Sequence, residues 1–188
     1  MRWVSASLLA GKIALLAALY WAGGELARGM ALPPGYSSSI WPAAGIALAF
    51  LLRFGKRHWP GILLGSMLVN VDIGAPWYVG ACIGIGASLQ ALLGHKLANG
   101  ERHEHMCAFK ANTLQSEILR VALLGGLVSC CVSSIWGTST LCMARLVPWA
   151  DWPVQMLTWW VGDALGVVLF APISLILTDA LRKKAPVV

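Results

Sequence analysis

Residues 37–72, SSSIWPAAGIALAFLLRFGKRHWPGILLGSMLVNVD, decide how the chain is built. They hold two apolar segments, each opened by a Trp-Pro pair (Trp41-Pro42 and Trp59-Pro60), with the basic sequence RFGKRH between them. Each segment is shorter than the ~20 apolar residues that cross a bilayer core upright. Short apolar segments punctuated by Pro and Gly indicate a site inside a membrane protein, because irregular backbone at that depth survives only where protein or a cavity covers it.

The composition places the chain in a lipid bilayer. Of its 188 residues, 58% are hydrophobic and 12% are charged, and the mean hydropathy is +0.71. Soluble domains average about 45–50% apolar and about 25% charged residues. The net charge of +6 could suggest nucleic acid, but the basic residues lie at the ends of apolar segments, so we expect no nucleic-acid partner. The longest polar stretch, residues 99–115, is too short for a soluble catalytic domain of about 50 residues or more.

Six apolar segments predict an all-α, polytopic transmembrane helix bundle that forms one domain over residues 1–188. The predicted spans are residues 5–24, 40–54, 59–72, 77–97, 116–143 and 153–177. One set of their flanks carries eleven Lys and Arg residues, and the opposite set carries two. Because basic residues collect on the cytoplasmic side, we expect both termini in the cytoplasm of a bacterial inner membrane, Trp41 at the outer face and Trp59 at the inner face. The two Trp-Pro segments then form an antiparallel pair.

Small residues spaced four apart predict where the helices pack. Glycine lets two backbones approach closely in lipid, so such pairs predict a compact bundle without identifying a dimer. The predicted packing positions are Gly61/Gly65, Gly80/Gly84 and Gly162/Gly166, together with Gly45 of the first Trp-Pro segment.

Asp163 is the residue that most strongly suggests a function. It lies about ten residues inside the last predicted span, or ~15 Å from the outer end and close to mid-membrane. A carboxylate at that depth costs about 2.5–3.5 kcal/mol, so it is a candidate functional residue. Helical spacing places Trp159 and Gly166 on the same face as Asp163, which makes that face a candidate ligand wall. In the structural alternative, Asp163 pairs with a basic side chain or accepts backbone N–H groups freed near Pro42 or Pro60.

Asn70 is predicted at a similar depth, ~16 Å from the start of its span, where it would meet Asp163 if the two spans touch. The alternative role for Asn70 is a hydrogen bond to a neighbouring helix, and Gln90 in the fourth span has the same two interpretations. We take the candidate binding residues for a small-molecule ligand to be Trp41, Pro42, Asn70, Trp159 and Asp163.

Other chemistry has little support in the sequence. Residues 102–107, RHEHMC, have the side chains of a metal site, but these are crowded together and no second cluster accompanies them. We expect a solvated loop there, and neither a metal nor a cofactor. No nucleophile with a base and an orienting group is visible, so we expect no catalytic residues and no enzyme activity.

Three motifs in this order resemble the MASE1 integral membrane sensory domain: WPAAGIALA at residues 41–49, WPGILLG at residues 59–65 with Asn70 after it, and GDALGV at residues 162–167. The resemblance covers about residues 8–178. The matching positions are Trp41, Pro42, Gly45, Trp59, Pro60, Gly65, Asn70, Gly162, Asp163, Gly166 and Pro172.

The resemblance implies the membrane sensor that precedes the output domain of bacterial histidine kinases and diguanylate cyclases. That domain usually has more spans than the six for which this chain has room, and the printed sequence contains no output domain. We therefore expect a non-enzymatic sensory or regulatory module that acts through another membrane or signalling protein.

Two other functions fit the same sequence. In size and span number alone, the chain also resembles the substrate-binding subunit of energy-coupling-factor vitamin importers, which would make it a small-molecule-binding transport component. Alternatively, the chain would be an accessory or structural subunit of a larger membrane protein complex.

Overall fold

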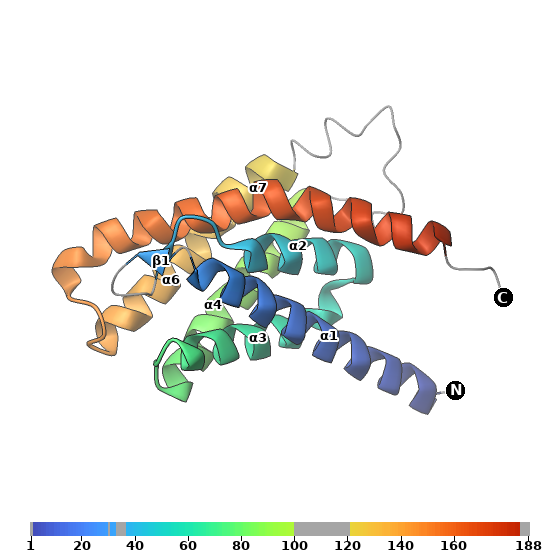
Figure 1. Cartoon of the computed structure of the whole chain (residues 1–188), viewed down its shortest axis with the longest axis horizontal. Coiled ribbons are helices and arrows are strands. Elements are labelled where there is room, and N and C mark those ends of the chain that lie inside the picture. Colours follow the sequence, from blue (N-terminus) through green and yellow to red (C-terminus); the bar gives the residue numbers. More distant parts are fainter. Residues whose placement is uncertain (1, 30, 33–36, 100–120, 185–188) are drawn as a thin grey trace.

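The computed structural model describes residues 2–29, 31–32, 37–99 and 121–184, and nearly all of them are helical (Figure 1). The helices are α1 (Arg2–Arg28), α2 (Pro42–Phe54), α3 (Trp59–Asp72), α4 (Trp77–Asn99), α6 (Cys130–Met143) and α7 (Trp152–Lys184). Short helical turns join some of them: the 3-10 helices η1 (Lys56–His58) and η3 (Trp149–Asp151) and the π-helix η2 (Val121–Val128). Two short strands, β1 (Ala31–Leu32) and β2 (Ser37–Ser38), pair antiparallel between α1 and α2.

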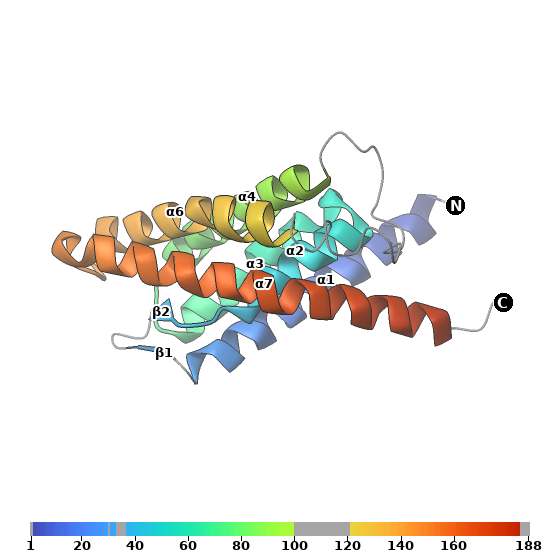
Figure 2. The ribbon, with the colours of Figure 1, turned by 90° about the horizontal axis from the view of Figure 1, so that it is seen from above.

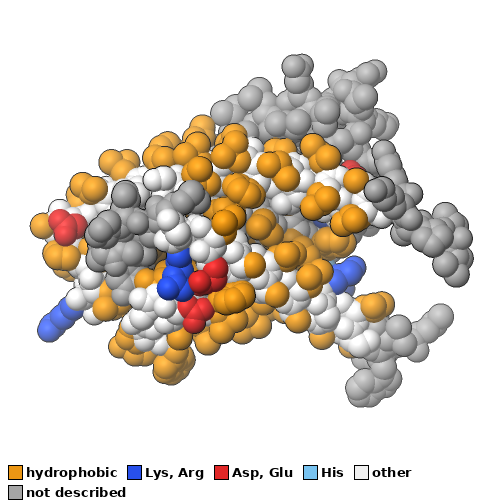
Figure 3. Space-filling view, viewed as in Figure 1, with side chains coloured by type: hydrophobic (Ala, Val, Ile, Leu, Met, Phe, Trp, Pro, Cys, Tyr) orange, Lys and Arg blue, Asp and Glu red, His pale blue; other side chains and the backbone are white. Residues whose placement is uncertain are grey.

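The prediction of an all-α transmembrane bundle is confirmed. Four helical segments are long and apolar enough to cross a bilayer: Ala6–Arg28, Trp77–Ala98, Gly126–Met143 and Trp149–Leu181. Large hydrophobic side chains are exposed along these segments, and they cover much of the face shown in Figure 3. A surface of this kind suits contact with lipid rather than water.

The two Trp-Pro segments form short helices, with 13 residues in α2 and 14 in α3. At 1.5 Å per residue each is about 20 Å long, against a hydrocarbon core of about 30 Å. Proline at the first or second position starts each helix, where its missing N–H leaves no helical bond unmade. Gly55 ends α2 with φ +95°, a value that side chains disfavour, and its N–H donates to the Leu51 carbonyl at 2.8 Å.

Helix α2 occupies the centre of the bundle, and ten of its 13 residues are buried. It packs on α7, α1 and α4, while α3 packs on α4 and α1, and α6 lies between α4 and α7. The prediction that the two Trp-Pro segments pack against each other is therefore wrong. The two helices do run in opposite directions, but α1 and α4 are the partners that they share (Figure 1).

The start of α1 and the end of α7 lie at the same end of the bundle in both views (Figures 1 and 2). The basic turn η1 between α2 and α3 is at this end too (Figure 1). Which side of the membrane this end faces stays a prediction from the charge pattern.

Each glycine that we expected at a helix contact lies against a neighbouring element. A side chain at any of these positions would meet main-chain atoms of that neighbour. Gly61 and Gly65 meet α1, Gly80 and Gly84 meet α3, Gly45 meets α7, Gly162 meets β2, and Gly166 meets the start of α2.

Candidate functional site

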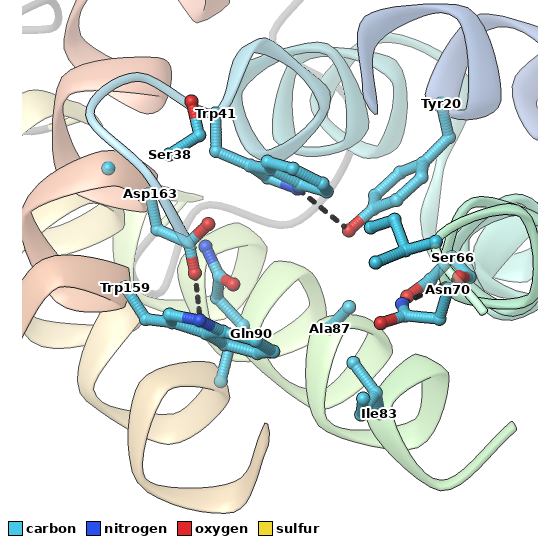
Figure 4. A pocket seen from close by; sticks show the side chains of 13 residues that line it. Tyr20, Ser38, Trp41, Ser66, Asn70, Ile83, Ala87, Gln90, Trp159 and Asp163 are labelled. Atoms are coloured by element: carbon cyan, nitrogen blue, oxygen red, sulfur yellow. Dashed lines mark hydrogen bonds between the residues drawn. The ribbon is translucent and has the colours of Figure 1, made fainter. Parts of the chain in front are cut away.

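A cavity of about 40 Å³ lies inside the bundle (Figure 4). Five helices and β2 each contribute a polar side chain to its wall: Tyr20 (α1), Ser38 (β2), Asn70 (α3), Gln90 (α4), Ser133 (α6) and Asp163 (α7). The cavity therefore has room for water or for a ligand of a few non-hydrogen atoms.

Asp163 lies on the wall of this cavity and is 7% exposed. Its Oδ2 accepts a hydrogen bond from the Ser133 hydroxyl of α6. In the part of the chain that the structure describes, no Lys, Arg or His side chain forms an ion pair with Asp163. The structural alternative of a basic partner therefore finds no support, and a single hydroxyl compensates the carboxylate only in part.

Main-chain contacts hold Trp41 beside Asp163. The Trp41 backbone N–H donates to the carbonyl of Gly162 at 2.9 Å, and its own carbonyl oxygen lies against Gly166. This arrangement fixes the start of α2 on the turn of α7 that carries the acid. The Trp41 indole N–H also donates to the Tyr20 hydroxyl at 3.4 Å, which links the wall to α1.

Asn70 faces Asp163 from the opposite side of the cavity (Figure 4). The residue is 5% exposed, and its amide donates to the Ser66 carbonyl of its own helix at 2.8 Å. The expected hydrogen bond to a neighbouring helix is therefore replaced by one within α3. Asn70 and Asp163 therefore line the same cavity from opposite sides and do not contact each other through an assigned hydrogen bond.

Trp159 lies one helical turn before Asp163 and also lines the cavity. Its ring rests on Gly137 of α6, where any side chain would collide with the indole. The indole Nε1 is buried and has no hydrogen-bond partner among the residues that the structure describes. A buried donor without a partner costs about 1–3 kcal/mol, so a water or ligand acceptor in the cavity would stabilise this arrangement.

A comparison with protein families identifies the chain. The family model of MASE1 matches residues 9–186, nearly the whole chain. The chain belongs to the MASE1 family. MASE1 is a membrane-associated sensory domain, so the protein is a membrane sensory module. Comparisons with curated proteins and with solved structures returned no match.

Four of the five candidate residues of this MASE1 chain line the cavity; Pro42 does not. It is buried in the first turn of α2 and contributes by starting the helix there. Sequence reasoning missed four other polar side chains of the wall: Tyr20, Ser38, Ser66 and Ser133. Tyr and Ser residues are scattered through the chain, and no spacing signal marks which of them face inward.

Metal and cofactor binding find no added support. Among the residues that the structure describes, no group of three or more His, Cys, Asp and Glu side chains is arranged to hold a metal ion. The RHEHMC sequence at residues 102–107 lies outside the described residues.

Proposed function

We propose that this MASE1 chain is a non-enzymatic sensor of the bacterial inner membrane that binds a small polar ligand and acts on another membrane or signalling protein. The observation that supports it is the buried cavity with Asp163 on its wall. A carboxylate and an unpaired indole N–H are both costly inside a bilayer, and intramembrane ionisable groups usually mark functional sites.

The small volume of the cavity favours a sensor over a transport component. Pockets for drug-sized or vitamin-sized molecules measure about 300–1,000 Å³. The cavity of about 40 Å³ would have to grow several-fold to hold such a cargo.

Two helices connect the cavity to the end of the bundle where a partner is proposed to dock. Helices α2 and α7 meet at the cavity through Trp41 and Gly162, and again near the other end of α2, where Arg53 pairs with Asp179 at 3.1 Å. A ligand that displaces α7 at the cavity would therefore also change the distance between Arg53 and Asp179. The basic residues of η1 lie nearby, and the positive-inside rule assigns this end to the cytoplasm.

The test is site-specific crosslinking in native membranes from Leu181, an exposed residue near the end of α7. We expect one crosslinked protein whose yield changes in Asp163→Asn and Asn70→Ala. Asp151→Asn is the matched control, because Asp151 is exposed in η3 and does not line the cavity. Unchanged crosslinking in both cavity variants, in correctly inserted protein, would refute the sensory role of the cavity.

A further inference from the structure

We propose that the ligand of the cavity is a short primary amine, with its ammonium group on Asp163. The inference rests on the proposed sensory function, because it takes the cavity as the ligand site, and it names the chemical class of that ligand.

The carboxyl group on the cavity wall favours a cation as the ligand. Of the residues that the structure places on the wall, Asp163 alone has an acidic side chain, and none has a basic one. The Ser133 hydroxyl is its hydrogen-bond donor, and the amides of Asn70 and Gln90 are neutral. An uncompensated charge in an apolar interior is costly, and a bound cation beside the carboxylate offsets that cost.

The aromatic side chains favour an ammonium group over a metal ion. The indole rings of Trp41 and Trp159 lie on two sides of the Asp163 carboxylate, and the Tyr20 ring borders the same space (Figure 4). Aromatic rings attract an ammonium group through their negative faces, whereas Ca²⁺ and Mg²⁺ need about six or more oxygen ligands. A single carboxylate surrounded by aromatic rings therefore suits an ammonium group better than a metal ion.

The size of the cavity and the unpaired indole limit the amine further. About 40 Å³ admits a molecule of a few non-hydrogen atoms, such as methylammonium or ethanolamine. The Trp159 N–H needs an acceptor, and Trp159 lies one turn from Asp163 on the same helix face. An amine with a hydroxyl group can meet both residues at once, through its ammonium group and its oxygen.

The experiment measures the melting temperature of the full chain in detergent with methylammonium, ethanolamine, sodium or potassium chloride at equal ionic strength and pH. We expect the two amines to raise Tm saturably, by about 5–10 °C at 100 times Kd, and the metal cations to raise it less. The shift should be lost in Asp163→Asn and kept in Asp151→Asn.

Trp159→Phe tests the same assignment even if Asp163→Asn fails to fold. The substitution keeps an aromatic ring at position 159 and removes the N–H donor. We expect ethanolamine binding to weaken about five- to tenfold more than methylammonium binding, because both amines lose part of the aromatic surface and ethanolamine also loses a hydrogen bond. Equal weakening of both amines would overturn the placement of the hydroxyl on Trp159.

Each negative result identifies which proposal fails. If no amine shifts Tm, or if sodium shifts it equally, the amine assignment is wrong, even where Asp163→Asn still alters crosslinking from Leu181. If the amines bind but crosslinking stays the same in Asp163→Asn, the amine site stands and the sensory function fails.

Discussion

The contact between α2 and α7 at Gly166 allows a quantitative prediction for Gly166→Ala. A Cβ at this position would touch the Trp41 carbonyl oxygen and lie 2.7 Å from the carbonyl carbon. Relaxed contacts between non-bonded carbons are ~3.5–4.0 Å, so the start of α2 has to move by about 1 Å. Because both atoms belong to the main chain, no side-chain rotation can relieve the collision.

The cost of Gly166→Ala has three parts. Overpacking costs about 1–3 kcal/mol, and the hydrogen bond from Trp41 to Gly162 lengthens from 2.9 Å, which costs about another 0.5–1.5 kcal/mol. Alanine also stabilises α7 by up to about 1 kcal/mol relative to glycine, because its helix propensity is higher. We expect a net destabilisation of about 0.5–4.5 kcal/mol.

The assay is reversible unfolding in mixed micelles of increasing SDS fraction, followed by circular dichroism. Gly11→Ala is the matched control, because no neighbouring atom lies within 4 Å of a Cβ at that position. This control should be neutral or up to about 1 kcal/mol more stable. If Gly166→Ala is as stable as Gly11→Ala, the backbone contact between α2 and α7 is not as close as described.

Three further predictions use the same preparation or the same cells. Asp179→Asn should lower the free energy of unfolding by about 1–3 kcal/mol, because it leaves Arg53, whose side chain is 8% exposed, without its partner. Glu25→Gln, which breaks the exposed pair with Arg28, should lower it by less than about 1 kcal/mol. Ser133→Ala should cost about 1–3 kcal/mol by removing the hydroxyl that donates to Asp163, and a wild-type unfolding curve would contradict that bond. Reporter fusions at both termini should give a cytoplasmic signal, and a periplasmic signal from either would reverse the proposed topology.

The local elements of the fold could be predicted from the sequence because their ends carry chemical signals. Trp41-Pro42 and Gly55 bound α2, and Trp59-Pro60 opens α3, where the predicted segments start and stop. The neighbours of these helices could not be predicted in the same way. Apolar residues lie all round α3, so nothing in its sequence indicates that it packs on α1 and α4 rather than on α2.

The candidate site could be predicted only for polar residues whose position deep within an apolar span was itself unusual. Asp163 lies about ten residues inside its predicted span and Asn70 about eleven residues from the start of its own, and both line the cavity. Ser133 carries no such signal, because its hydroxyl lies 3.1 Å from the Cys130 carbonyl of its own helix, as the Thr138 hydroxyl lies 2.6 Å from the Ser134 carbonyl. Only the packing of α6 against α7 distinguishes the serine that turns toward the acid.

The shortness of α2 and α3 also bears on how the chain enters the membrane. Helices of 13 and 14 residues hold too few apolar side chains to be retained singly by the insertion machinery as they emerge from the ribosome. Because the three-residue turn η1 joins them, the two helices can partition into lipid together. Because Gly45 and Gly166 bring α2 against α7, α2 reaches its final surroundings only after α7 has been synthesised. The cavity is therefore completed well after α2 and α3 have left the ribosome.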